Sequence, residues 1–223
     1  MSWLDIFKSP GPPAPEWQEY LDHFKTRLPL KTMVEEVNFL VLDLETTGLN
    51  SRKDHMLSLG AVQVRNLEIK VDQRMEYFVQ QSGYTPNESI SIHGILPEQS
   101  AAGKEEAELI KELLEFLRAD VIVGHHIRFD VSVLNQSTKR IYGRPLKNHV
   151  IDTVDLIRKW DRLSLQRPHR DLSLDAVCER WQIPLHERHT AAGDTLITAI
   201  LFLKLLGNLQ RKGIKTLGAL LSH

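Results

Sequence analysis

Two carboxylates stand at the end of an apolar segment, in the stretch Phe39-Leu-Val-Leu-Asp-Leu-Glu-Thr-Thr-Gly-Leu49. The segment predicts a β-strand over residues 39–44, and side chains two positions apart in a strand point to the same face. Asp43 and Glu45 would therefore lie side by side. Like charges this close repel unless a cation or a proton lies between them. The stretch alone is compatible with a metal site, an acid–base pair, or a strand that simply ends in polar residues.

Two further segments place ionisable residues at the ends of predicted elements. The first, Val121-Ile-Val-Gly-His-His-Ile-Arg-Phe-Asp130, is an apolar strand that continues into a helix with Asp130 in its first turns. The second, His189-Thr-Ala-Ala-Gly-Asp194, opens a later helix, and Asp194 follows His189 by about one and a half turns. Open α/β sheets place their sites at the carboxyl ends of strands and the adjacent helix N-termini. We therefore expect all of these side chains to converge.

Four carboxylates gathered in one place would repel too strongly without a cation. Oxygen ligands select hard cations, Mg²⁺ or Mn²⁺, over zinc. Two such ions about 4 Å apart suit in-line displacement at a phosphodiester, because one activates the water and the other stabilises the leaving oxygen. Histidine is the usual general base near neutral pH, which is the role available to His189.

The elements that must position these residues follow from hydrophobic periodicity. Strands are expected at 39–44, within 55–69 and at 71–79, joined by short connections in an antiparallel meander. Helices and short strands then alternate, with helices at 105–117, through 129–141, and at 154–160, 172–181 and 190–206, and strands at 120–123 and 149–151. This order predicts an α/β sheet with mixed strand directions.

The N-terminal region differs in composition from the rest. A stiff proline-rich spacer, Ser9-Pro-Gly-Pro-Pro-Ala-Pro15, separates the peptide of residues 1–8 from a helix expected at 16–28. We divide the chain into an N-terminal extension (1–35), one α/β domain (36–210) and a C-terminal tail (211–223). The helix at 16–28 is expected to pack on the α/β domain.

The composition of the 223 residues sets limits on partners and location. The formal net charge of −1 has no global basic character, so nucleic-acid binding would depend on a local patch or on metals. The single cysteine, Cys178, excludes a disulfide within the chain, fits a reducing compartment and is interpreted as a core residue. No uninterrupted apolar run reaches about 18 residues and no signal peptide is evident, so we expect a cytoplasmic protein without a membrane partner.

Three short segments resemble, in order and spacing, the motifs of the DEDDh 3′–5′ exonucleases: Asp43-Leu-Glu-Thr-Thr-Gly48, Gly124-His-His-Ile-Arg-Phe-Asp130 and His189-Thr-Ala-Ala-Gly-Asp194. That family includes the proofreading epsilon subunit of bacterial DNA polymerase III, ribonuclease T and oligoribonuclease. The resemblance covers roughly residues 38–206. It implies a ribonuclease-H-like fold, a mixed five-stranded sheet flanked by helices. The histidine at 189 indicates the h-type subgroup, since the y-type has a tyrosine where Thr190 stands.

The resemblance also implies roles for individual residues. Asp43, Glu45 and Asp194 would bind two divalent ions, Mg²⁺ or Mn²⁺, with Asp43 shared between them. Asp130 would complete the acidic set directly or through water, and His189 would be the general base. The implied substrate-binding residues are Thr46, Thr47, Gly48 and Leu49 at the terminal nucleotide, His93 at the terminal base, and Phe129 stacking or packing beneath the substrate.

One position departs from the family pattern. The second motif usually reads Gly-His-Asn, and His126 stands here at the asparagine position. That asparagine shapes the site, so we expect a changed substrate preference before a change in activity. His125 and His126 are both interpreted as packing or hydrogen-bonding residues.

The expected function is a metal-dependent 3′–5′ exonuclease that releases nucleoside 5′-monophosphates, with single-stranded DNA favoured and a proofreading or repair role. The alternatives are an exoribonuclease of the same fold, or a polymerase-associated subunit that docks or binds ends. Trp3-Leu-Asp-Ile-Phe7 is similar to sliding-clamp-binding peptides, although Trp3 replaces the usual glutamine, and a simple anchor or tail is the other interpretation. The basic run Arg158–Arg162, with Arg167 and Arg170, is either a phosphate-binding segment or a solvated loop.

Overall fold

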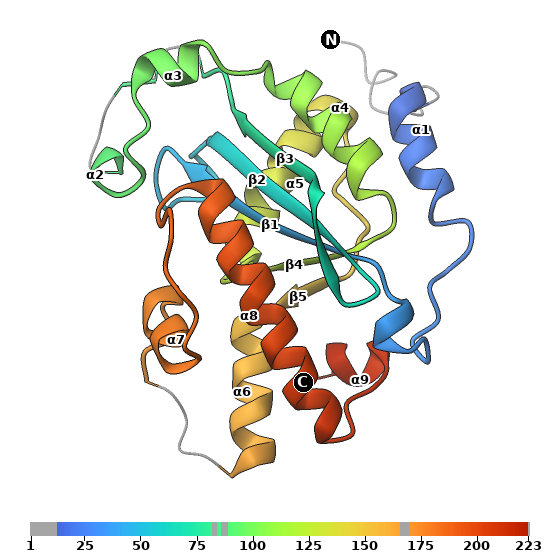
Figure 1. The fold of residues 1–223 in the computed structure, drawn as a ribbon. Helices are drawn as coiled ribbons and strands as arrows, with labels where there is room; N and C mark the ends of the chain where they lie inside the picture. The colour runs from blue at the N-terminus through green and yellow to red at the C-terminus, as the bar shows by residue number, and fades with distance from the viewer. Residues whose placement is uncertain (1–12, 82–83, 86–88, 166–169, 223) are drawn as a thin grey trace.

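The computed structural model describes residues 13–81, 84–85, 89–165 and 170–222 (Figure 1). Its centre is a mixed five-stranded sheet in the order β3-β2-β1-β4-β5. The strands are β1 Phe39–Thr46, β2 Met56–Arg65, β3 Glu68–Phe78, β4 Val121–Gly124 and β5 Val150–Asp152. β1, β2 and β3 pair antiparallel, while β4 pairs parallel with both β1 and β5. The expected meander and mixed sheet are confirmed.

Helices cover both faces of the sheet (Figure 1). One layer holds α6 Thr153–Ser164, α7 Leu174–Arg180, α8 Ala191–Arg211 and α9 Leu217–Leu221. The other holds α1 Pro15–Asp22, α4 Glu106–Leu117 and α5 Arg128–Tyr142. The remaining short helices are η2 Val34–Glu36, α2 Ile90–His93 and α3 Pro97–Ala101.

The alternation of β1 decides which layer its polar residues face. Phe39 and Val41 belong to the core beneath α8, whereas Leu40 and Leu42 belong to the core beneath α4 and α5. Residues two apart share a face, so the two acids at the end of β1 continue the row of Phe39 and Val41. The strand therefore delivers its acids to the α8 side of the sheet.

Helix α8 crosses β1 and β2 at close range (Figure 1). Gly60 on β2 permits the approach, because a Cβ built there would lie 2.2 Å from the carbonyl oxygen of Ala191. By length and mean hydropathy α8 would qualify as a membrane span, yet 61% of its apolar window is buried inside the protein. Its composition thus follows from its position in the core.

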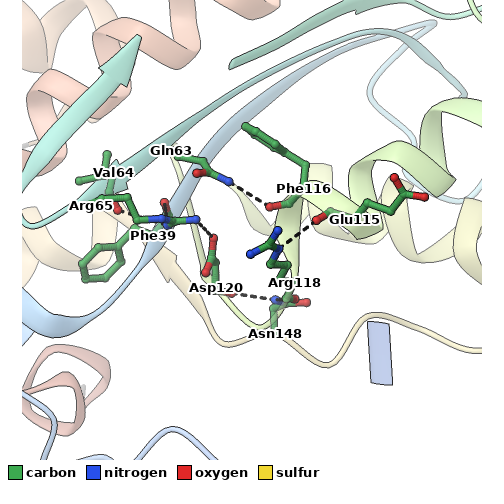
Figure 2. Close-up of polar contacts among 9 residues, drawn as sticks. All are labelled: Phe39, Gln63, Val64, Arg65, Glu115, Phe116, Arg118, Asp120 and Asn148. Carbon is green, nitrogen blue, oxygen red and sulfur yellow. Dashed lines mark hydrogen bonds and ion pairs between the residues drawn. The ribbon is translucent and has the colours of Figure 1, made fainter. Parts of the chain in front are cut away.

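A polar network joins the strands at the end of the sheet where β1 and β4 begin (Figure 2). Arg65 at the end of β2 pairs with Asp120 at 2.5 Å and donates to the carbonyl oxygen of Phe39 at 3.3 Å. The Asn148 amide donates to the carbonyl oxygens of Asp120 (2.7 Å) and Arg118 (2.9 Å). Because these groups bond to one another, this end of the sheet is tied together, and the acids of β1 lie at the opposite end.

Several expected bounds differ from the structure. The first helix ends at Asp22 instead of residue 28, and it does pack on the domain, with Trp17 and Tyr20 buried and the Tyr20 hydroxyl 2.6 Å from Asn148. Cys178 is buried in the core as expected. The sequence pattern did not predict α9 or the short helices α2 and α3. The clamp-like peptide and most of the proline-rich spacer lie outside the described residues.

Candidate functional site

Three carboxylates meet where β1 ends and α8 begins. Asp43 and Glu45 occupy the last half of β1, and Asp194 lies in the first turn of α8. One oxygen from each lies within 4.8 Å of the others. The expected convergence of the first and third segments is therefore present in the structure.

Asp130 approaches the same cluster from the second segment. It lies in the first turn of α5 and is buried, and it is outside the group whose oxygens lie within 4.8 Å. Burial raises the pKa of Asp130 well above its usual value, and the charges of Glu45 and Asp152 raise it further. It is thus electrostatically linked to the cluster.

The carboxylates disfavour one another's ionisation. The pKa of Asp43 is raised well above its usual value, first by burial and then by the charges of Asp130, Asp194 and Glu45. The pKa of Glu45 is raised to about 7, by burial and then by Asp194. Because each effect destabilises the charged form, full ionisation of the set requires positive charge close by.

Arg188 supplies one such charge, and the sequence pattern did not predict it. Its guanidinium pairs with Asp194 and also with Asp175 of α7, whose oxygen is 2.6 Å from Arg188 Nε. The charge of the arginine offsets part of the rise in the pKa of Asp43 and Glu45, and its hydrogen bond holds the pKa of Asp175 below the usual value. In the sequence, Arg188 is visible only as a cation directly before His189. That position does not indicate an ion pair with the acids, which depends on the fold.

The donor set fits a hard divalent cation. The other oxygen of Asp194, Oδ1, is buried and has no hydrogen-bond partner within the described part of the chain. A buried carboxylate oxygen without a partner is costly, and a metal ion would satisfy it. Carboxylates alone, without sulfur or a clustered imidazole, are the ligands that Mg²⁺ and Mn²⁺ prefer.

A cavity of about 520 Å³ opens beside Glu45. His189 lines it from the loop before α8, in a left-handed conformation with φ of 63°. His93 lines it from α2, held by Ser89 Oγ at 3.0 Å and by the backbone amide of Ile95 at 3.0 Å. The structure thus brings the expected general base and the expected base-pocket residue into one cavity with an acid.

Two aromatic residues of this cavity were not predicted from the sequence. Tyr77 and Phe78 line its wall from the end of β3. The alternation of β3 indicates only that Tyr77 is a strand residue, and nothing in that local pattern indicates a ligand. Phe78 is 40% exposed, and its ring suits stacking with a base. The Tyr77 ring packs against the core on the α4–α5 side, with Lys104 Nζ 4.0 Å from its centroid.

The turn after β1 is held by its own side chains. Thr46 Oγ1 donates to the carbonyl oxygen of Gly48 at 2.7 Å, and Thr47 Oγ1 donates to Asp54 at 3.0 Å. A Cβ at Gly48 would lie 2.8 Å from the Asp54 carboxylate, so only glycine fits without displacement. Leu49 is 88% exposed at the tip. These contacts hold the turn together, and Leu49 at its tip is presented to solvent.

Phe129 lies away from that cavity. It is half-buried in α5 and packs against the core on the α4–α5 side of the sheet. The structure does not bring it together with His93 and His189, which line the cavity.

The two histidines of the second segment are structural, as expected. His125 is buried between Thr153 Oγ1 (2.7 Å) and the carbonyl oxygen of Leu172 (2.8 Å). His126 has a φ of 54°, and its backbone amide donates to Asp152 at 3.0 Å. Asparagine and histidine both adopt this left-handed conformation more readily than most residues. This preference explains why histidine can replace asparagine there.

The basic run divides into separate roles. Lys159 is buried and its ammonium donates to the carbonyl oxygens of Ala219 (2.6 Å) and Leu220 (3.2 Å), which fastens α9 to α6. Arg158 pairs with Asp155 at 3.5 Å on the surface. Arg167 lies outside the described residues.

A mixed five-stranded sheet with helices on both faces and acids at the end of its central strand defines the ribonuclease-H-like class of nucleases. The family described as Exonuclease matches residues 40–202, and the chain belongs to that family. The resemblance inferred from the three segments is confirmed at this level. Exonucleases of this family depend on divalent metals, in keeping with the acidic cluster.

Known relatives carry this region within longer proteins. The chain is 32% identical over 188 residues to "DNA polymerase III PolC-type" of Caldanaerobacter subterraneus subsp. tengcongensis, covering 81% of this chain and 12% of that protein. It is also 32% identical over 196 residues to "DNA polymerase III subunit epsilon-like protein" of Rhodobacter capsulatus, covering 86% of this chain and 27% of the relative. The chain therefore spans a small part of these relatives.

Solved structures of exonuclease I share the fold. The E. coli enzyme in complex with a dT13 oligonucleotide has a TM-score of 0.70 at 21% identity, over 78% of this chain and 42% of the other. The enzyme from Methylocaldum szegediense has a TM-score of 0.68 at 24% identity, over 79% and 41% respectively.

Proposed function

We propose that this chain is a metal-dependent 3′–5′ exonuclease that releases nucleoside 5′-monophosphates from the 3′ end of DNA. The observation that carries the proposal is the meeting of Asp43, Glu45 and Asp194 within 4.8 Å, with the pKa values of Asp43 and Glu45 raised by burial and mutual repulsion. Membership of the Exonuclease family supports the reaction class.

The acids are proposed to hold two ions, Mg²⁺ or Mn²⁺. Asp43, Glu45 and Asp194 are the direct ligands, and Asp130 completes the set directly or through water. When bound, such ions supply an activated water and stabilise charge on the departing oxygen. Arg188 pairs with Oδ2 of Asp194, which leaves Oδ1 as the oxygen available to a metal ion.

His189 is proposed to take the proton from the attacking water, since it shares a cavity with Glu45. The turn Thr46–Leu49 is proposed to hold the terminal nucleotide, with exposed Leu49 against its base. His93 would line the base pocket. Phe129 would support the substrate from beneath, through the packing of α5.

Single-stranded DNA with a free 3′ end is the proposed substrate in a cytoplasmic protein. The PolC-type and epsilon-like relatives are DNA polymerase III proteins by name, and an exonuclease I structure contains a dT13 oligonucleotide. A polymerase or sliding clamp that binds the N-terminal peptide remains a proposal, because that peptide lies outside the described residues.

Substitution of Asp43 with alanine tests the assignment. Loss of a ligand from the cluster should lower the rate of hydrolysis of a 3′-labelled DNA strand in Mg²⁺ by about a thousandfold or more. The exposed Asp72 of β3 provides a matched control, and Asp72→Ala should hydrolyse at the rate of the unmodified chain. Undiminished hydrolysis by Asp43→Ala would show that the acids have another role.

A second function is suggested by the names of the relatives, which are "DNA polymerase III PolC-type" and "DNA polymerase III subunit epsilon-like protein". In such proteins a nuclease domain can act mainly as a docked subunit of a polymerase. Turnover by the purified chain alone supports the free enzyme, and turnover that appears only with a polymerase subunit supports docking. The same turnover measurement is made with single-stranded DNA, with matched RNA and with mismatched primer–template ends. Preference for the DNA substrates supports a proofreading or repair enzyme, and preference for RNA supports an exoribonuclease.

A further inference from the structure

A basic groove lies beside the turn at the end of β1. It has a volume of about 430 Å³ and is lined by Ser51, Arg52, Arg128, Val131, Ser132, Asn135, Gln136, Lys139 and Val150. Three of these residues are cations, and none of the residues that line it in the described structure is a carboxylate. This composition stands out in a chain of net charge −1. We call this surface the α5 groove.

One wall of the α5 groove is a continuous face of helix α5. The α5 residues that line it fall at positions i, i+3, i+4, i+7, i+8 and i+11, counted from Arg128. That spacing puts them on one side of the helix. Arg128 and Lys139 are eleven residues apart, which corresponds to about 16 Å along the helix axis. A stacked strand has one phosphate about every 3.4 Å, so this wall matches about four or five nucleotides.

The other wall ties the α5 groove to the terminal-nucleotide turn. Ser51 and Arg52 belong to the loop that continues from Leu49. Ser132 donates from α5 to Ser51 at 3.2 Å, which fastens this loop to the helix. Because the loop runs directly from Leu49 to Arg52, the α5 groove adjoins the turn that is proposed to hold the terminal nucleotide.

Arg128 occupies an unfavourable position for a structural cation. It lies at the start of α5, where the helix dipole is positive and disfavours a positive side chain. Asp155 pairs with it at 2.9 Å, but the Arg128 side chain remains 72% exposed. An exposed cation at the N-terminal end of a helix, where the dipole disfavours it, indicates that the residue has a role other than stabilising the fold. Phosphate is a ligand that an arginine there suits.

We propose that the α5 groove binds the sugar–phosphate backbone of the substrate strand, over the nucleotides that precede the 3′-terminal one. This inference rests on the proposed nuclease function, and it adds where the substrate strand lies beyond its 3′-terminal nucleotide. Between the cations, Ser51 Oγ accepts from Ser132 and Asn135 Oδ1 accepts from the Leu146 amide, so the Ser51 hydroxyl and the Asn135 side-chain amide group are the donors proposed for phosphate oxygens. The groove has only Val131 and Val150 as apolar contacts within the described structure, so it recognises the backbone and is indifferent to sequence.

The test compares two neutralised pairs of cations. The groove variant carries Arg52→Gln with Lys139→Gln, one exposed loop arginine and one exposed helix lysine. The control carries Arg27→Gln with Lys111→Gln, an exposed loop arginine and an exposed lysine of α4 outside the groove. Both change the net charge equally. Binding of a labelled 20-nucleotide strand and of a dinucleotide is measured by fluorescence anisotropy without divalent cations, so that neither is cleaved.

The groove variant should bind the 20-nucleotide strand at least about fivefold more weakly than the control, and the loss should shrink to less than about twofold for the dinucleotide. The slope of log affinity against log salt should also decrease in magnitude by about 1.4, because two phosphate contacts are lost. Equal affinities of the two variants for the long strand would overturn the inference, as would an equal loss for the dinucleotide. Since binding is measured without turnover, this result is independent of the Asp43→Ala experiment.

Discussion

Arg188 joins two carboxylates that lie on different helices, Asp194 of α8 and Asp175 of α7. Its removal would leave Asp194 and its acidic neighbours without a paired cation in a largely buried place. Arg188→Ala should therefore lower the free energy of unfolding of the metal-free protein by about 3 kcal/mol, and Arg188→Lys should recover part of that loss. Urea unfolding in a chelator measures the effect.

A divalent ion should compensate for the missing guanidinium. Addition of Mn²⁺ is expected to raise the unfolding midpoint more in Arg188→Ala than in the unmodified chain, because the ion then supplies the positive charge near Asp194. Equal stability of the variant and the unmodified chain in chelator would contradict this role.

His125 adds a dependence of stability on pH. Burial lowers the pKa of His125 to about 4, below the ordinary value of about 6.5. Between these values the unfolded chain binds a proton that the folded chain does not. The free energy of unfolding should therefore fall by up to about 3 kcal/mol as the pH falls from about 6.5 to about 4, and level off below.

Glu45 also makes stability depend on pH, in the opposite direction, because its pKa is raised to about 7. The contribution of His125 is therefore measured as the difference between the unmodified chain and His125→Gln, in which the contribution of Glu45 cancels. Glu45 favours folding below about pH 4.5 and loses that contribution as the pH rises to about 7. The difference in unfolding free energy between the unmodified chain and His125→Gln should shrink toward about pH 4. A constant difference would disprove the assignment, and the exposed His23→Gln serves as control.

At the scale of elements, the site exists because β1 and α8 approach closely. Alternation in β1 sends Asp43 and Glu45 toward α8, and Gly60 lets the first turn of α8 descend onto β2. The carbonyl oxygen of Ala191 occupies the space that a side chain at position 60 would need. The distance between Asp194 and the β1 acids is thus set by a glycine on a third element.

Gly60→Ala is expected to push the start of α8 away from the sheet. The clash should lower the free energy of unfolding by about 1–3 kcal/mol, and it should also weaken Mn²⁺ binding, because Asp194 moves with the helix. Gly207→Ala is the matched control within α8. Nothing lies within 4 Å of a Cβ there, so this substitution should leave metal binding intact and stabilise the helix slightly. Thermal unfolding and isothermal titration with Mn²⁺ measure both effects.

At the scale of the whole molecule, polar contacts tie one end of the sheet together, and the clustered acids lie at the other end. The network of Arg65, Asp120 and Asn148 satisfies the polar groups where β1 and β4 begin (Figure 2). The acids and the 520 Å³ cavity adjoin the opposite end, and the α5 groove begins there at Ser51 and Arg128. The relatives contain this unit as a fraction of longer polymerase proteins, which suits a domain whose chemistry is confined to one edge.

The sequence by itself determined the parts of this protein that depend on local periodicity. Alternation in 39–44 placed Asp43 and Glu45 on one face, and the helix-start position of Asp194 predicted that it would meet them. The structure has both features, because strand period and helix start are short-range properties. Asp130 and His189 lie near these acids but outside the group whose oxygens lie within 4.8 Å.

Only the tertiary structure decided which residues meet from distant segments. The role of Arg188 follows from its two ion pairs, one with Asp175 of α7 and one with Asp194 of the acidic cluster on α8. Phe78 of β3 and His93 of α2 line one cavity, and Arg52 and Lys139 line one groove because a loop is fastened to α5. Such contacts depend on how distant elements pack together. The spacing of neighbouring residues in the sequence does not predict them.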